Sequence, residues 1–312
     1  MKRFFLLVIG AMVLFGGVIP VYASTSCATK YPIILVHGMG MKDQNLVGIN
    51  YWWGIPGALR DCGATVYVTN QDPMNGIAER AQQVANELGE QFAVNPQWTK
   101  INIIAHSMGP LDSRHLTTNL SIPGKGPARN YVASLTSISG VNGGAEIADL
   151  LWNLDNGVPV LGKIAGNVIS AAVNAFYGIF FYDQEDKNCM KGLYNLTTNY
   201  VQNIFNPNTP NVPGIMYQSW GGKINYVGVT PDQLFIGPLW VLMKALGAGD
   251  NDCLVSIKSA KLGTWRGALT TSLLFPGVNH LYEIGQMLGF TPGFDAPRFY
   301  VNVVKELKAN GY

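Results

Sequence analysis

The sequence predicts an α/β protein with a mostly parallel central sheet and helices on both faces of that sheet. Short apolar runs alternate with segments of helical pattern through the N-terminal half, and this alternation is typical of βαβ units. The chain has 312 residues, a length that suits one large domain of this class. No internal repeat or low-complexity segment argues for another architecture.

The predicted elements follow one another in regular order. Four apolar runs are expected strands, at residues 32–36, 64–68, 101–104 and 131–138. Helical patterns separate them, at residues 52–60, about 77–92 and 110–116. Because parallel strands need crossover connections of this kind, each helix is expected to pack on one face of the sheet.

A different pattern occupies the middle of the chain. Residues 158–182 are apolar over nearly the length that spans a bilayer. Lys163, Asn167, Ser170 and Asn174 nevertheless form one polar stripe at helical spacing, which a surface helix needs and a membrane-spanning helix does not. We expect a mobile helical lid within an insertion at about residues 150–205. An ordinary core-packed helix is the alternative.

The N-terminus has the pattern of a secretory signal peptide. Lys2 and Arg3 precede an apolar run at residues 4–18, and the segment that ends at Ala23 resembles a cleavage site. We expect removal of residues 1–23 on export, which leaves residues 24–312 as one secreted, extracellular domain. A retained membrane anchor is the alternative interpretation.

Charge and cysteine content restrict the class of partner and the compartment. The 21 basic residues nearly balance the 19 acidic ones, and no basic stripe indicates nucleic-acid binding. Four cysteines in the exported part fit no zinc-binding spacing, and disulfides persist in an oxidising compartment. We expect Cys27–Cys62, because both residues precede runs predicted to be neighbouring strands. Cys189–Cys253 then follows by elimination.

A strand, a tight turn and a helix surround Ser107. The segment Ala105-His106-Ser107-Met108-Gly109 matches the G-x-S-x-G nucleophile elbow, except that Ala105 replaces the first glycine. Such a turn exposes a serine hydroxyl and places the Met108 N–H at the N-terminus of a helix, where a developing anion is stabilised. This context predicts a serine nucleophile on an α/β-hydrolase fold.

A serine nucleophile needs a base and an orienting carboxylate. Among the four histidines, His37 follows the first strand, His106 lies inside the elbow and is expected to point away from its chemistry, and His115 lies in the next helix. Elimination makes His280 the expected base.

The acid is expected between the serine and the histidine, as in the usual chain order of this fold. Asp250 and Asp252 are the best placed, and Asp232 is a weaker candidate. An oxyanion hole needs two backbone donors, which we assign to the N–H groups of Met108 and of Met39, in the turn after the first strand.

Several segments together resemble the Pseudomonas/Burkholderia-type secreted triacylglycerol lipases. They are residues 31–39, 51–56 and 64–68, the elbow, Ser113-Arg114, Asn251-Asp252 with Leu254-Val255, and Asn279-His280-Leu281 with Glu283-Ile284 and Gln286. The resemblance implies a triad of Ser107, Asp252 and His280, with Asp252 preferred over Asp250. It also implies oxyanion donors at Met39 and Met108, a lid at residues 158–182, and export through the periplasm, in some members with a folding chaperone.

The chain departs from this family at its structural calcium ion. The positions of the two aspartates that hold the ion are occupied by Thr230 and Tyr282, while Gln286 and Phe290 remain as relics of the site. Calcium prefers carboxylate oxygens, so we predict that the site is absent and that no cofactor is required. A shift of two residues in the alignment would bring Asp232 into the site.

The sequence therefore predicts a secreted, monomeric serine lipase that acts on acylglycerol esters at an oil–water or membrane interface. An esterase for short soluble esters with the same triad is the second hypothesis. A catalytically inactive hydrolase fold that binds membranes or partner proteins is the third.

Overall fold

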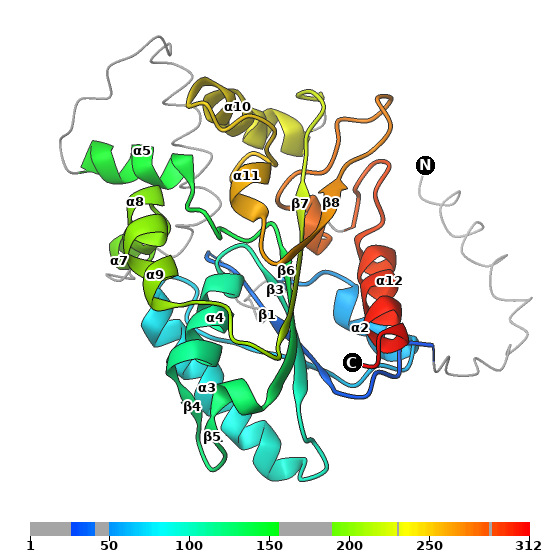
Figure 1. The fold of residues 1–312 in the computed structure, drawn as a ribbon. Helices are drawn as coiled ribbons and strands as arrows, with labels where there is room; N and C mark the ends of the chain where they lie inside the picture. The colour runs from blue at the N-terminus through cyan, green and yellow to red at the C-terminus, as the bar shows by residue number, and fades with distance from the viewer. Residues whose placement is uncertain (1–25, 41–49, 156–188, 230, 287–288) are drawn as a thin grey trace, which may run out of the picture.

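The computed structural model describes residues 26–40, 50–155, 189–229, 231–286 and 289–312 (Figure 1). The expected signal peptide and the predicted lid helix at 158–182 lie outside these residues. Within them, no helix is both long and apolar enough to span a bilayer.

A parallel sheet forms the centre of the domain (Figure 1). In the described part of the chain its strand order is β2-β1-β3-β6-β7-β8, and all neighbouring pairs are parallel. The bounds are Ile33–Val36 for β1, Val66–Val68 for β2, Ile101–His106 for β3, Val132–Ile138 for β6, Met216–Gly222 for β7 and Thr264–Leu269 for β8. The four predicted strands are confirmed, and β7 and β8 are additional.

Helices cover both faces of this sheet, as predicted. On one face lie α3 (Ile77–Val94) and α4 (Gly109–Asn119), whose apolar side chains pack against β1 and β3. On the other face lie α2 (Ile55–Asp61) and α12 (Ala296–Ala309), which pack against each other and the sheet (Figure 1). The predicted helix at 52–60 therefore begins three residues later than expected.

Shorter elements complete the domain. Between α4 and β6 lie a small hairpin and a 3₁₀ turn: β4 (Ser121–Ile122), β5 (Gly126–Pro127) and η1 (Ala128–Asn130). Between β7 and β8 lie α10 (Pro231–Ala245) and α11 (Ile257–Ala260), and η3 (Tyr282–Ile284) precedes α12.

A helical insertion connects β6 to β7, and residues 156–188 of the lid region predicted at about 150–205 lie outside the described part of the chain. Its described elements are α5 (Glu146–Asp155), α7 (Cys189–Asn195), α8 (Thr198–Tyr200), η2 (Val201–Phe205) and α9 (Asn206–Asn208). Arg114 of α4 attaches the insertion to the sheet by donating to Asn206 Oδ1 and to the Thr209 carbonyl, each at 2.8 Å.

The two predicted disulfides have different outcomes. Cys27–Cys62 is confirmed and joins the segment before β1 to the end of α2. Cys189–Cys253 is wrong, because both residues are thiols in the structure. Cys253 is buried in the loop before α11, within an apolar cluster that Cys189 contacts from its edge. Elimination counted cysteines but carried no information on their Cβ directions, which decide whether a bridge can form.

Candidate active site

The elbow has the strained geometry that a serine nucleophile requires. β3 ends at His106, Ser107 has a φ of 60°, and α4 begins at Gly109. A left-handed conformation is costly for a serine, so the surrounding structure must hold it. It does so by two backbone bonds, from Ser107 N–H to the Ile138 carbonyl and from Val141 N–H to the Ser107 carbonyl.

Two glycines let neighbouring segments approach the elbow closely. A Cβ on Gly109 would lie 2.4 Å from the Val36 carbonyl oxygen, and a Cβ on Gly38 would lie 2.5 Å from Ser107 Cβ. Ala105, by contrast, is accommodated inside β3, where it pairs with Val36 and Ser137. The replacement of the first motif glycine therefore leaves the turn intact.

His280 and Asp252 form a buried hydrogen-bonded pair. The ring nitrogen Nδ1 of His280 donates to Asp252 Oδ2 at 2.8 Å, and the side chains are 5% and 0% exposed. The other carboxylate oxygen accepts from the N–H groups of Leu254 and Val255, at 2.9 and 2.7 Å. These bonds fix the carboxylate and leave Nε2 of His280 as the nitrogen available for proton transfer.

Asp250 has a different role. It lies at the surface in ion pairs with Lys223 and Lys244, at 2.7 and 3.1 Å. Hydrogen bonds from these two ammonium groups lower its pKa. The geometry thus distinguishes the two candidate acids, and only Asp252 bonds to His280. The side chain of Asp232 is not among those described.

Ser107, Met39 and an apolar pocket adjoin one another at the carboxyl edge of the sheet. The pocket is lined by Met39, Ser107, Val141, Ala145, Ile147, Ala148, Leu196, Leu254 and Val255. Within the described residues, neither the Met39 N–H nor the Met108 N–H donates to a backbone carbonyl. Both groups are therefore available to an oxyanion beside Ser107.

His106 and Glu283 form a polar network that the sequence did not predict. His106 Nε2 lies 2.8 Å from Glu283 Oε2, and Nδ1 lies 2.6 Å from Tyr51 Oη. The His106 ring also packs against that of His280, with centroids 4.4 Å apart, so the expectation that it points away from the chemistry is wrong. Glu283 is fully buried, with its second oxygen accepting from Ser139 Oγ at 2.6 Å.

Burial determines the charge of this network. It raises the pKa of Glu283 well above its usual value, and the neighbouring carboxylate of Asp252 adds to the effect. Burial and then the nearby His280 lower the pKa of His106 well below its usual value. Both shifts favour the arrangement in which Glu283 carries the shared proton and donates it to a neutral His106 imidazole.

Among the described residues, neither the buried histidine–glutamate cluster nor the family's calcium position fits a metal ion. His106, His280 and Glu283 have ligand atoms close enough for a cation, but hydrogen bonds already engage both ring nitrogens of His106, Nδ1 of His280 and Oε2 of Glu283. At the position where the family holds calcium, Tyr282 is buried and supplies a phenol. The Gln286 amide donates to the carbonyls of Asn50 and Tyr51, both at 2.7 Å.

Comparisons with known proteins find triacylglycerol lipases among the relatives of this chain. A Burkholderia plantarii triacylglycerol lipase is 30% identical, over 86% of this chain and 83% of its own. A Pseudomonas fragi triacylglycerol lipase is 28% identical, over 92% of this chain and 99% of its own. No model of a protein family matches the chain.

Solved structures show the same fold. Staphylococcus hyicus lipase superposes with a TM-score of 0.62 at 18% identity, over 90% of this chain and 97% of its own. The mature form of the Bacillus licheniformis lipase BlEst2 gives a TM-score of 0.61 at 19% identity, over 90% and 93%.

Fold and relatives together define the class: the protein is an α/β-hydrolase that hydrolyses carboxylic esters. Within that class, the chain belongs to the triacylglycerol lipase family that includes the Burkholderia and Pseudomonas enzymes.

Substitution of the two neighbouring aspartates should separate their roles. We expect Asp252→Asn to lower kcat by about 10²–10⁴-fold, because the amide cannot hold the imidazole in its acceptor tautomer. Asp250→Asn is the matched control and should stay within about twofold of wild type, since an exposed ion pair contributes little. Steady-state kinetics on one ester measures both. Equal losses would contradict the assignment.

Replacement of Glu283 tests its protonation. The folded protein keeps a proton that the unfolded chain releases above about pH 4.5, so this group's contribution to stability falls as pH rises until Glu283 ionises. Glu283→Gln resembles the protonated acid but has no proton to release. Its unfolding free energy relative to wild type should rise by up to about 1.4 kcal/mol per pH unit as the pH increases above about 5, until Glu283 of the folded wild type ionises. Urea titrations measure this, and a difference independent of pH would refute the protonated state.

Proposed function

We propose that this protein is a secreted serine lipase that hydrolyses acylglycerol esters through an acyl-enzyme. The observation that carries the proposal is the His280–Asp252 pair, in which the His280 ring packs against His106 of the strained serine elbow. Ser107 acts as nucleophile, His280 as general base and acid, and Asp252 as the orienting carboxylate.

The chemistry follows from these positions. Ser107 Oγ bonds to the ester carbonyl carbon while His280 Nε2 takes the hydroxyl proton. The N–H groups of Met39 and Met108 stabilise the tetrahedral oxyanion. Its collapse breaks the bond to the alcohol oxygen, which receives the proton from His280. Water then attacks the acyl-enzyme by the same route, and fatty acid and free Ser107 result.

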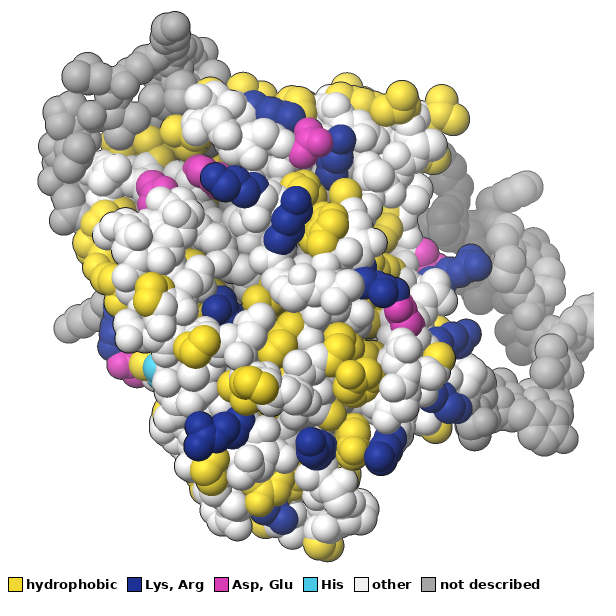
Figure 2. All heavy atoms as spheres, in the orientation of Figure 1, with side chains coloured by type: hydrophobic (Ala, Val, Ile, Leu, Met, Phe, Trp, Pro, Cys, Tyr) yellow, Lys and Arg dark blue, Asp and Glu magenta, His cyan; other side chains and the backbone are white. Residues whose placement is uncertain are grey.

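Exposed aliphatic side chains favour a lipid surface over a soluble ester as the substrate source. Leu273 and Leu274 are 82% and 84% exposed in the loop that leads from β8 to His280, and Leu234 of α10 is 61% exposed. Tyr226 Oη donates to the Leu274 carbonyl at 3.0 Å, which joins this loop to the segment before α10. Figure 2 shows hydrophobic side chains along this upper rim. Exposed apolar groups gathered on one rim are typical of an interfacial contact.

We further propose that the protein is exported after removal of residues 1–23, works as a monomer, and requires no calcium ion. The N-terminal charge and hydropathy pattern supports export. The phenol of Tyr282 at a family ligand position supports calcium independence. A folding chaperone remains an expectation from the family resemblance alone.

Acyl-chain dependence distinguishes the lipase from the esterase. Wild type should be faster on emulsified long-chain triglyceride than on a short soluble ester, and Ser107→Ala should lose at least about 10⁴-fold on both while it stays folded. Activity confined to the soluble ester would favour the esterase. Failure of an organophosphonate to label Ser107 in the wild type would favour the inactive hydrolase.

Chelation tests calcium independence. We expect the melting temperature to change by less than about 2 °C with EDTA. A structural ion would stabilise the folded state by its binding free energy, and the proposed calcium-independent protein has no such contribution to lose. Differential scanning calorimetry with EDTA and with added calcium measures this. A large destabilisation by EDTA that calcium reverses would show that Asp232 or other groups complete the site.

A further inference from the structure

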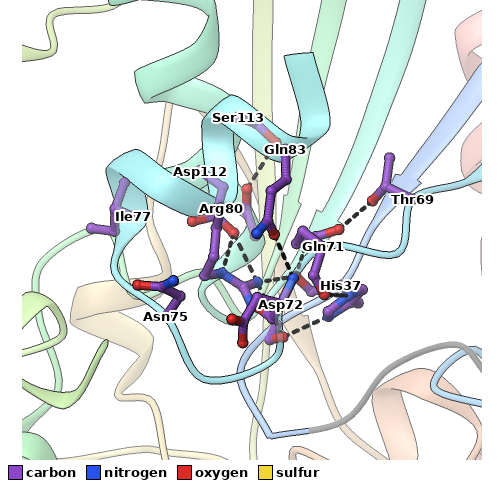
Figure 3. Close-up of polar contacts among 12 residues, drawn as sticks. His37, Thr69, Gln71, Asp72, Asn75, Ile77, Arg80, Gln83, Asp112 and Ser113 are labelled. Atoms are coloured by element: carbon purple, nitrogen blue, oxygen red, sulfur yellow. Dashed lines mark hydrogen bonds and ion pairs between the residues drawn. The ribbon is translucent and has the colours of Figure 1, made fainter. Parts of the chain in front are cut away.

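A fully buried arginine contacts the turn that carries the Met39 N–H. Arg80 of α3 and Asp112 of α4 are both 0% exposed, and they form an ion pair with Arg80 Nη2 and Asp112 Oδ2 2.8 Å apart. Figure 3 shows the guanidinium between α4 and the segments that carry Gln71, Asp72 and His37. Because the removal of an arginine from water is costly, its hydrogen bonds inside the protein must compensate for the lost hydration.

The guanidinium donates to three backbone carbonyls in addition to Asp112. Arg80 Nη2 lies 2.8 Å from the His37 carbonyl oxygen and 3.1 Å from that of Gly38, and Nη1 donates to the Asp72 carbonyl. The side chain of Gln71 supports the same turn by donating to the His37 carbonyl at 3.0 Å. Two successive carbonyls of the turn are thus directed toward one cation.

The planarity of the peptide bond converts this contact into an orientation for Met39. In a trans peptide the C=O and the following N–H point in opposite directions. When the Gly38 carbonyl points at Arg80, the Met39 N–H must point away from it. Met39 and Ser107 line one pocket, and Gly38 lies against Ser107.

Asp112 connects the same cation to the second donor. It lies one turn into α4, the helix whose N-cap residue is Met108, and its N–H bonds to the Met108 carbonyl at 3.3 Å. The Arg80–Asp112 pair therefore joins the turn of the first oxyanion donor to the helix of the second. From this geometry we infer that Arg80 and Asp112 are positioning residues that set the orientation and separation of the two oxyanion donors. The inference rests on the proposed function, since it concerns the same reaction.

A double substitution tests the inference with limited damage to folding. Arg80→Met with Asp112→Leu replaces the buried pair by apolar side chains of similar size, a change that proteins often tolerate. A misdirected donor should lower kcat by about 10–100-fold, short of the loss that deletion of a donor causes, and leave KM within about threefold. The inhibition constant of an alkylboronic acid, whose adduct with Ser107 carries the tetrahedral charge, should rise by the same factor. That of an alkyl ether of equal length should not change.

The controls separate positioning from general destabilisation. Arg114→Met removes a second buried arginine, which lies on α4. The Arg114 side chain contacts Asn206 and Thr209 and not the oxyanion turn. This substitution should leave the ratio of boronate to ether affinity unchanged. Assays at about pH 8.5 keep Asp112 ionised, because burial raises its pKa to about 7 against the attraction of Arg80. Should the double variant not fold, Asp112→Asn keeps the shape of the site and should show the same selective loss of boronate affinity.

Equal losses of boronate and ether affinity, or no loss in a folded variant, would overturn the inference. A wild-type enzyme that binds no boronate and hydrolyses no ester would instead overturn the proposed function, and the positioning role with it.

Discussion

The left-handed backbone at Ser107 is the constraint on which the arrangement of the site depends. A serine at φ 60° is unfavourable in isolation, so backbone bonds to the segment after β6 and close packing under β1 must compensate for it. The absence of side chains at Gly38 and Gly109 is what permits that packing, because a Cβ at either position would collide with Ser107 or with the end of β1. The left-handed turn places the Ser107 hydroxyl at the end of β3, and the close packing around the turn requires residues without a side chain at Gly38 and Gly109.

Around that turn, the parallel sheet brings distant segments to one edge. Met39 follows β1, Ser107 follows β3, and the loops of Asp252 and His280 follow β7 and β8. Their separation in the sequence is no obstacle, since the carboxyl ends of parallel strands share an edge and ligands bind there. The network of His106 and Glu283 lies behind this edge, where burial keeps it uncharged in total beside the His280–Asp252 pair.

Local sequence patterns predicted the N-terminal half of the fold and the elbow, because apolar runs and turn residues reflect the environment of their own segment. The same patterns failed for β7, where Gln218, Ser219 and the glycines interrupt the apolar run, and for the edge strand β8, which is largely exposed. Contacts between residues far apart in the sequence could not be predicted for a different reason. Nothing near His106 in the sequence indicates Glu283, which is 177 residues away, and the count of cysteines could not reveal that no disulfide joins Cys189 to Cys253.

The backbone and the side chain of Met39 have different roles. Its N–H is the donor proposed for the oxyanion, while its side chain forms part of the apolar wall of the pocket beside Ser107. The contacts of the neighbouring residues determine the backbone orientation at this position. The thioether can therefore be replaced by a larger or smaller group without a change in the direction of the Met39 N–H. Substitution of the Met39 side chain can therefore change the shape of this pocket while the backbone donor proposed for the oxyanion stays in place.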